Sequence, residues 1–380
     1  MGSARATMET ETHTTRYRRH TPLLVGSLLA AASLLWLQGA VPRAAQRQGS
    51  RPPVFQVDPD WPAPLPNHWV LGPVSGIGID PQDHIVLVQR AESDSVRKAG
   101  GVPAPHVVEL DRAGKVVRTW GGKGTGYAWM EQVHGLTVDP KNRIWISGNG
   151  ENDAHLLVFS RTGQFLKQIG TPGSRRGSND TANLGAATHM RFDPERNEVF
   201  VSDGEQNRNH RVIVLDADTG QYKRHWGAYG AKPDDTAVEA RFDPNGPPPK
   251  QFGSAVHCLR IARDGLVYVC DRSNNRFQVF RKDGTFVREV FVAKETRGTG
   301  SVWDIEFSPD QSYVYVADGT NQKVHILRRD TFEEVGSIGG PGTGPGQFAT
   351  SLHVLMVDSR GNLYTGEAAA AGRIQKFVLK

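Results

Sequence analysis

The feature that most constrains the fold of this 380-residue chain is a pattern that occurs six times. Each copy contains an apolar strand, a turn such as DPxN or xDG, and a second apolar strand. The copies are SGIGIDPQDHIVLVQR (75–90), HGLTVDPKNRIWISG (134–148), THMRFDPERNEVFVSDG (188–204), HCLRIARDGLVYVCDR (257–272), WDIEFSPDQSYVYVADG (303–319) and HVLMVDSRGNLYTGE (353–367). Most continue into two further strands, as in RFQVFRKDGTFVREV. Each copy therefore predicts a four-stranded antiparallel sheet.

One such sheet cannot bury both of its faces, so the copies must stack on one another. Sheet repeats spaced by roughly 45 to 70 residues are typical of a β-propeller, and six copies predict an all-β, six-bladed one. The last copy ends at RIQKFVLK with three strands, while PVFQV (53–57) is a strand without a blade. We expect this N-terminal strand to complete the last blade, which leaves no open sheet edge. Residues 51–380 are then a single propeller domain.

Residues 1–50 are predicted to be a targeting segment rather than part of the fold. The basic run RYRRH precedes the uncharged stretch TPLLVGSLLAAASLLWLQGAV, and polar sequence follows. The chain is therefore expected to be exported, to a periplasm or to the extracellular medium. We favour a cleaved signal peptide, but the stretch is long enough to span a bilayer, so an uncleaved membrane anchor is the alternative.

The aligned copies place histidine at one recurring position. The residue five places before the turn aspartate, or its equivalent, is in chain order Ser75, His134, Thr188, His257, Trp303 and His353. Histidine thus fills alternate blades, whose innermost strands point at the axis from directions about 120° apart in a six-fold ring. Three neutral imidazoles with an open fourth position are a common way to hold a catalytic zinc ion. The alternative is that each histidine only bonds a neighbouring blade.

His189 lies one place past this position, next to Thr188. Because successive side chains of a strand point to opposite faces, His189 should turn away from the other three and should not be a ligand.

The chain has only two cysteines, Cys258 and Cys270, on two predicted strands joined by the turn RDG. Counting outward from the turn places them opposite each other. A cross-strand disulfide is therefore possible in an oxidising compartment, and two buried thiols are the alternative.

The chain after residue 55 resembles the NHL-repeat propellers, and among them the peptidyl-α-hydroxyglycine α-amidating lyases. The similar segments are GIGIDPQDHIVLVQR, HGLTVD, PKQFGSAVHCL and VCDRSNNRFQVF. The resemblance implies a six-bladed propeller with zinc on His134, His257 and His353. It also implies that Arg90 and Arg272 face the metal and bind the hydroxyl and carboxylate region of the substrate. A guanidinium suits a carboxylate because its fork matches the two oxygens and keeps its charge.

Two departures from the family pattern affect the chemistry. Glu205 in SDGEQNRNHR stands where the family has a tyrosine that is proposed as a catalytic base. A carboxylate near a cation is ionised and can accept a proton. Val354 replaces an aspartate that binds calcium deeper in the channel, so calcium would keep only backbone carbonyls such as those of Ile77 and Leu136. We therefore expect calcium binding to be weak or absent.

The sequence thus predicts an exported, zinc-dependent lyase with a small-molecule or peptide substrate, in which Arg90, Glu205 and Arg272 are catalytic residues. A monomer is expected, with membrane contact only through an uncleaved anchor. Nucleic-acid binding is not expected, although the net charge is +5, because no Lys/Arg block with interleaved aromatic residues follows the N-terminal segment. Two alternatives are a non-catalytic NHL scaffold that binds a protein or peptide, and a lactonase-like hydrolase that uses calcium and carboxylates.

Overall fold

The computed structural model of the protein describes residues 51–380 except for 238–240, 350 and 369–371. Residues 51–380 form one compact unit. The predictions of a signal peptide or membrane anchor fall on residues 1–50 and lie outside the described residues. None of the helices in the described part of the chain is long and apolar enough to cross a membrane.

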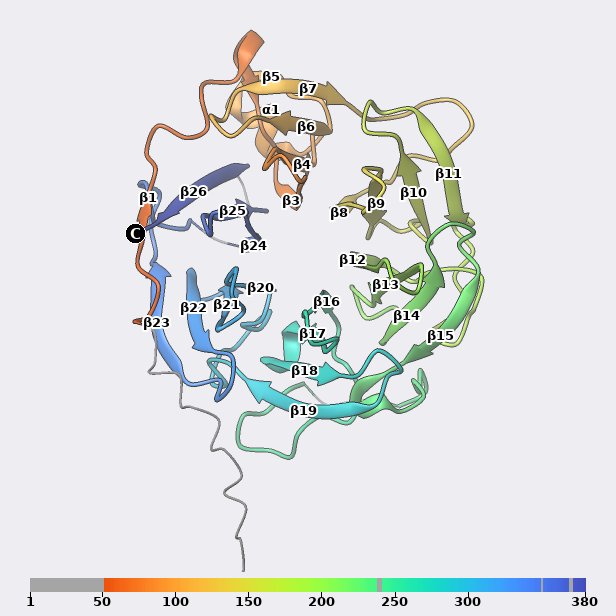
Figure 1. Cartoon of the computed structure of the whole chain (residues 1–380). Coiled ribbons are helices and arrows are strands. Elements are labelled where there is room, and N and C mark those ends of the chain that lie inside the picture. The colour runs from red at the N-terminus through yellow and green to blue at the C-terminus, as the bar shows by residue number, and fades with distance from the viewer. Residues whose placement is uncertain (1–50, 238–240, 350, 369–371) are drawn as a thin grey trace, which may run out of the picture. The chain divides into compact units, whose positions relative to one another are not determined.

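Six antiparallel sheets of four strands surround a central axis (Figure 1). We number these blades one to six in chain order. Blades one to three contain β3 (Val74–Ile79), β4 (Ile85–Gln89), β6 (Val107–Leu110), β7 (Val116–Trp120); β8 (Val133–Val138), β9 (Ile144–Gly148), β10 (His155–Phe159), β11 (Phe165–Gly170); and β12 (Ala187–Asp193), β13 (Glu198–Asp203), β14 (Arg211–Asp216), β15 (Tyr222–Trp226). Blades four to six contain β16 (Val256–Ile261), β17 (Val267–Asp271), β18 (Arg276–Phe280), β19 (Phe286–Phe291); β20 (Asp304–Phe307), β21 (Tyr313–Asp318), β22 (Lys323–Arg328), β23 (Glu334–Gly339); and β24 (Leu352–Val357), β25 (Leu363–Glu367), β26 (Arg373–Leu379), β1 (Phe55–Val57). The predicted fold is confirmed.

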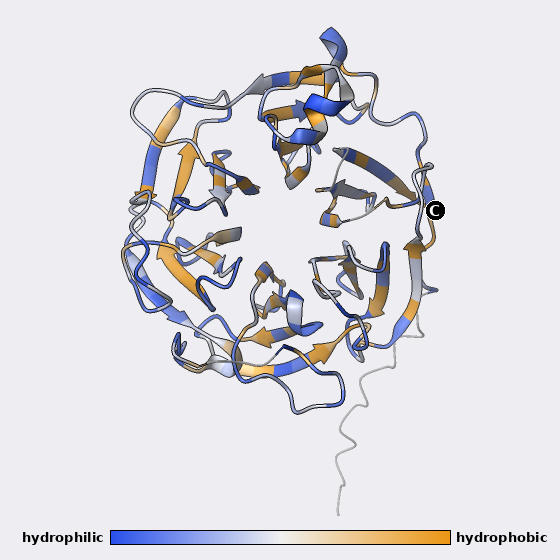
Figure 2. Ribbon diagram, turned by 180° about the vertical axis from the view of Figure 1, so that it is seen from behind, coloured by the Kyte–Doolittle hydropathy of each residue, from blue (hydrophilic) through white to orange (hydrophobic). Residues whose placement is uncertain are grey.

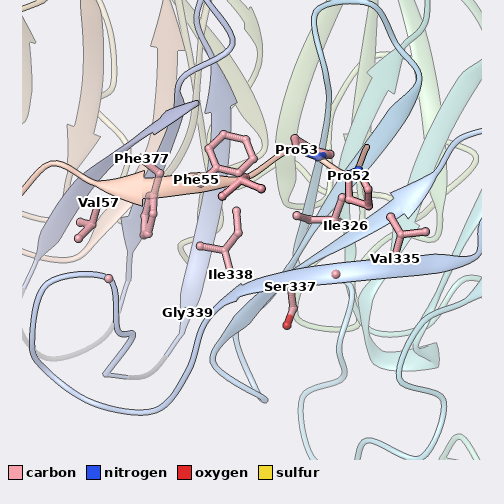
Figure 3. Close-up of a pocket in the computed structure, with 13 residues that line it drawn as sticks. Pro52, Pro53, Phe55, Val57, Ile326, Val335, Ser337, Ile338, Gly339 and Phe377 are labelled. Carbon is pink, nitrogen blue, oxygen red and sulfur yellow. The ribbon is translucent and has the colours of Figure 1, made fainter. Parts of the chain in front are cut away.

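The N-terminal strand closes the ring as expected. β1 pairs antiparallel with β26, so that Phe55 lies opposite Leu379 and Val57 opposite Phe377. The Phe55 ring packs edge-on against Tyr315 of blade five, with ring centroids 5.6 Å apart. Figure 3 shows Phe55, Val57 and Phe377 beside β23, at a pocket on the outer edge of the ring. The strand therefore completes blade six and also contacts blade five.

The core consists of six apolar clusters, each packed between neighbouring blades. The second strand of every blade is buried along its whole length, whereas the outermost strands of blades one to five are partly exposed. Figure 2 shows apolar residues gathered on the strands and polar residues on many of the connections. This stacking holds the first strand of each blade at the axis, where the aligned histidines lie.

Several smaller features accompany the blades. The helix α1 (Asp94–Ala99) and the short parallel strands β2 (Trp69–Val70) and β5 (Val102–Pro103) form an insertion at blade one. Single 3-10 turns occur at η1 (Pro66–His68), η2 (Ala228–Gly230) and η3 (Arg272–Asn274). Cys258 and Cys270 are opposite each other on β16 and β17 and form a disulfide, with Cα atoms 4.9 Å apart.

Candidate metal centre

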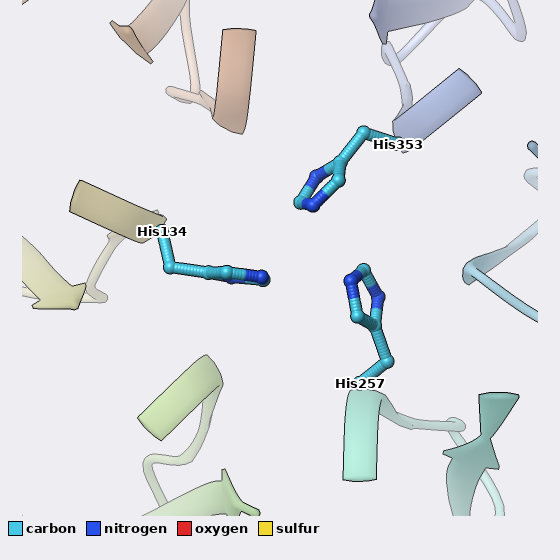
Figure 4. A group of neighbouring side chains, drawn as sticks. All are labelled: His134, His257 and His353. Atoms are coloured by element: carbon cyan, nitrogen blue, oxygen red, sulfur yellow. The ribbon is translucent and has the colours of Figure 1, made fainter. Parts of the chain in front are cut away.

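Three histidines from alternate blades meet at the axis. His134, His257 and His353 lie near the starts of β8, β16 and β24, the innermost strands of blades two, four and six. All three are buried, and their rings form a nearly equilateral triangle with centroid distances of 5.0, 4.8 and 4.7 Å (Figure 4). One ring nitrogen from each lies within 4.8 Å of the others. We call these residues the histidine triad.

The triad offers nitrogen atoms that are suited to a cation. The Nδ1–H of His257 donates a hydrogen bond to the Trp303 carbonyl, which leaves the Nε2 lone pair free. Among the described residues, no hydrogen-bond partner reaches His257 Nε2 or His353 Nδ1. Burial holds the pKa of His257 and of His353 well below the usual range, and neighbouring positive groups act in the same direction. Buried neutral imidazoles with unpartnered nitrogens fit a divalent ion such as zinc.

Glu205 lies beside the triad and is itself buried. Its Oε2 is 2.7 Å from His134 Nε2, and its Oε1 is 3.9 Å from His257 Nε2 and 3.1 Å from Arg272 Nη1. Burial opposes ionisation of this carboxyl group, but His134 and Arg272 outweigh it and hold its pKa well below the usual range. Glu205 is therefore an ionised carboxylate at the edge of the triad.

The loop that carries Glu205 connects β13 to β14 and has an unusual backbone. Gln206 and Asn207 both have left-handed backbone angles, with φ of 55° and 58°. Such angles are uncommon outside glycine and persist where surrounding contacts hold them. Here the Gln206 side chain donates to the Asn149 carbonyl at 2.9 Å, and the Asn207 N–H donates to the Ser254 carbonyl at 3.2 Å. These contacts fix the direction of Glu205 toward the axis.

The two predicted arginines also lie at this centre. Arg272 is in η3, and its guanidinium stacks over the Trp303 ring at 4.4 Å while it pairs with Glu205. Arg90 follows β4, and its Nε donates to the Val133 carbonyl at 3.2 Å, beside the first triad histidine. Burial lowers the pKa of Arg90, and the charge of Glu205 opposes this; burial also lowers the pKa of His353, and the charge of Arg90 acts in the same direction. The structure thus brings all six predicted site residues together.

Two residues of the centre were not predicted. Asn149 donates from Nδ2 to Glu205 Oε2 at 2.7 Å, and it lies on the β9–β10 connection, where no sequence period marks it. Trp303 holds His257 through its carbonyl and Arg272 through its ring. Trp303 was the fifth-blade member of the aligned position, so the alignment contained a signal that points to it.

His189 and Val354 complete the surroundings. The His189 ring is 6.3 Å from that of His134, and its Nδ1 is 3.6 Å from Asp304 Oδ1. The group of ligand atoms within 4.8 Å contains the triad without His189. Val354 is buried in an apolar cluster that includes Ile77, so no carboxylate stands at that position.

A second cluster of metal-binding residue types already has cationic partners. Asp80, His84 and Glu109 lie close together in blade one. Arg161 reaches both carboxylates, at 2.9 Å from Asp80 and 2.8 Å from Glu109, and Arg118 is 3.0 Å from Glu109. This cluster is therefore an ion-pair network between blades one and two.

Comparisons with known proteins find similarity to NHL-repeat proteins and to amidating enzymes. The family model described as NHL repeat matches residues 256–280. NHL repeat-containing protein 3 of Mus musculus is 23% identical over 333 residues, which cover 86% of this chain and 84% of that protein. Peptidyl-glycine alpha-amidating monooxygenase B of Xenopus laevis is 25% identical over 288 residues, which cover 70% of this chain but only 28% of that protein.

One further relative and one solved structure of similar fold are described as lyases. A probable peptidyl-alpha-hydroxyglycine alpha-amidating lyase of Caenorhabditis elegans is 24% identical over 225 residues, 55% of this chain and 56% of that protein. A crystal structure of catalytically inactive virginiamycin B lyase from Staphylococcus aureus with quinupristin has a TM-score of 0.50 at 14% identity, and the alignment covers 86% of this chain and 100% of that one. The latter shows a shared fold. The chain is thus a six-bladed propeller with an NHL repeat, and amidating enzymes are among its distant relatives.

Proposed function

We propose that this propeller is a metal-dependent lyase that cleaves peptidyl-α-hydroxyglycine into a peptide amide and glyoxylate. The observation that carries the proposal is the histidine triad with an ionised carboxylate, Glu205, 2.7 Å from His134. Zinc on His134, His257 and His353 would act as a Lewis acid and lower the pKa of the substrate hydroxyl. Proton transfer and binding of the substrate carboxylate are assigned to side chains of the protein.

Glu205 is the proton acceptor in this proposal. Its carboxylate takes the proton of the substrate hydroxyl, the C–O bond becomes a carbonyl, and the bond between the α-carbon and the amide nitrogen breaks. The electron pair of that bond leaves with the nitrogen, which receives the proton back and becomes the amide. The reaction therefore balances without an oxidant or reductant, and the carboxylate ends as it began.

Arg272 and Arg90 hold the carboxylate of the glyoxylate fragment. Arg272 is suited to this because its guanidinium is fixed by the Trp303 ring and has an Nε without a hydrogen-bond partner among the described residues. A guanidinium fork binds a carboxylate through two parallel hydrogen bonds. Glu205 now pairs with Arg272 at 3.1 Å, so substrate and Glu205 would share this cation.

An exported location is part of the proposal. The disulfide between Cys258 and Cys270 supports it, because disulfides persist mainly in oxidising compartments.

The test is an assay of zinc-loaded protein with N-benzoyl-α-hydroxyglycine, in which glyoxylate and benzamide are both measured. We expect the two products in equal amounts. Glu205→Gln should lose activity, whereas Glu195→Gln, which makes the same change at an exposed position, should not. Folded, zinc-loaded protein that releases no glyoxylate would rule out the proposed reaction.

The second candidate is a non-catalytic NHL scaffold. It is favoured by the mouse NHL repeat-containing protein 3, which matches 86% of this chain and 84% of its own length. A lactonase-like hydrolase is less well supported, because the centre consists of three imidazoles and one carboxylate rather than of several carboxylates. A scaffold would need no metal, so the metal content of the purified protein separates it from the lyase.

A further inference from the structure

A second layer of the central axis lies two residues along each innermost strand from the triad position. Its members in blades one to six are the residues Ile77, Leu136, Met190, Leu259, Ile305 and Leu355. The family resemblance implies a calcium ion held by carbonyl oxygens of this layer. In this chain, three of the carbonyls in this layer accept hydrogen bonds from the buried arginines Arg191 and Arg260.

Arg260 occupies this layer in blades four to six. Its Nη1 donates to the Leu259 carbonyl at 2.9 Å, and its Nη2 donates to the Leu355 carbonyl at 3.1 Å. The same guanidinium pairs with Asp304 at 3.0 Å through Nη2 and with Glu306 at 3.0 Å through Nε. Arg260 is 2% exposed and Asp304 fully buried. One buried side chain thus links three blades.

Arg191 makes the corresponding contacts in blades two and three. Its Nη1 donates to the Met190 carbonyl at 2.7 Å and to Thr137 Oγ1 at 3.0 Å. The two guanidiniums lie near each other, because Arg191 Nη2 and Arg260 Nη2 both contact Met356 Sδ, at 3.7 and 3.8 Å. Burial and the charge of Arg260 lower the pKa of Arg191 to about 9. Together they contact carbonyls of this layer in three of the six blades.

The charges of this layer are already balanced. Arg260 pairs with the carboxylates of Asp304 and Glu306, and the same two charges partly offset the lowering of the Arg191 pKa. Asp304 also accepts the Leu355 N–H at 2.9 Å. Burial opposes the charge of Arg260, but the two carboxylates outweigh it and raise its pKa. A calcium ion needs six to eight oxygen ligands, and here three of the carbonyl oxygens already accept N–H groups. Extra positive charge would be buried without a partner.

We propose that Arg260, assisted by Arg191, is the built-in cation of this axis and takes the place of calcium in holding the blades together. We therefore expect no calcium ion at the carbonyls of Met190, Leu259 and Leu355, which the arginines already contact. The inference concerns stability and does not depend on the lyase activity.

The first test compares thermal melting of zinc-loaded protein with and without millimolar calcium. We expect the melting temperature of the unmodified protein to stay the same, and equilibrium dialysis to find no bound calcium. A calcium-dependent rise in melting temperature, or stoichiometric calcium binding, would overturn the inference. This test uses only the unmodified protein, so its result does not depend on whether a variant folds.

The second test removes the guanidinium. Arg260→Ala leaves Asp304 and two carbonyls facing a cavity, and we expect the melting temperature to fall by about 5 to 10 °C. Calcium or free guanidinium should restore part of this loss. Arg276→Ala is the matched control, because Arg276 is equally buried and pairs with Asp271 at 2.8 Å away from this layer. An equal calcium response of both variants, or an Arg260→Ala protein that melts like the parent, would contradict the inference.

Discussion

Trp303 contacts both the histidine triad and Arg272, the proposed carboxylate ligand, through its backbone and its ring. The backbone carbonyl accepts the hydrogen bond of His257, whereas the ring supports Arg272 at 4.4 Å. The ring also lies 5.6 Å from the His257 ring and 5.9 Å from the His353 ring, but the hydrogen bond that orients His257 comes from the backbone. A substitution at this position should therefore disturb Arg272 more than metal binding. Trp303→Leu keeps an apolar side chain but removes the aromatic face, and Trp303→Phe keeps an aromatic face.

The size of the effect follows from the burial of this contact. Trp303 is 7% exposed, and a cation–π contact that is shielded from water contributes about 2 kcal/mol. If that stabilisation is lost, Arg272 no longer lies ready for a carboxylate, and binding should weaken about 30-fold. Trp303→Phe should weaken it only a few-fold, since phenylalanine retains part of the attraction.

The assay is calorimetric titration of zinc-loaded protein with glyoxylate, the proposed product, together with zinc analysis of each variant. We expect the affinity for glyoxylate to be highest in the parent, lower in the Phe variant and lowest in the Leu variant. The zinc content should be the same in all three. Equal glyoxylate affinity in the parent and the Leu variant would refute the role of the ring. Loss of zinc in the Leu variant would show that the side chain, rather than the carbonyl, supports His257.

Three further predictions concern other parts of the molecule. Deletion of residues 51–60 removes the pairing of β1 with β26 and the contact between Phe55 and Tyr315. The melting temperature in a calorimetric scan should therefore fall by about 10 °C. An unchanged melting temperature would contradict closure of the ring by β1. Mass spectrometry of unreduced, alkylated peptides should find Cys258 bonded to Cys270, and two alkylated cysteines would show the reverse. Glu205→Gln should lower turnover of N-benzoyl-α-hydroxyglycine by about 100-fold or more while zinc is retained, and full activity would remove Glu205 from the mechanism.

The blades could be predicted from the sequence because strand alternation and turns repeat along the chain. The same alignment predicted that His134, His257 and His353 lie together, since equivalent residues of alternate blades face one axis. The unpaired strand PVFQV predicted the closure through the need to cover a sheet edge.

Other features could not be predicted, because they depend on distances between blades rather than on a period along the strand. Asn149 lies on a connection, and only the folded ring places it against Glu205. Arg260 and Asp304 are 44 residues apart in the sequence and lie in neighbouring blades. No local pattern in the sequence therefore predicts that they pair. The insertion of α1, β2 and β5 was also missed, because its elements are too short to show a period.

Zinc analysis of purified protein tests the central claim most directly. The parent should contain about one zinc ion per chain, and alanine at His134, His257 or His353 should remove most of it, because two imidazoles bind zinc too weakly. His189→Ala is the matched control, because this histidine is also buried and its ring centroid is 6.3 Å from that of His134. This substitution should leave the zinc content unchanged. Equal metal content in all four variants, or a parent that binds no divalent ion, would contradict the metal centre.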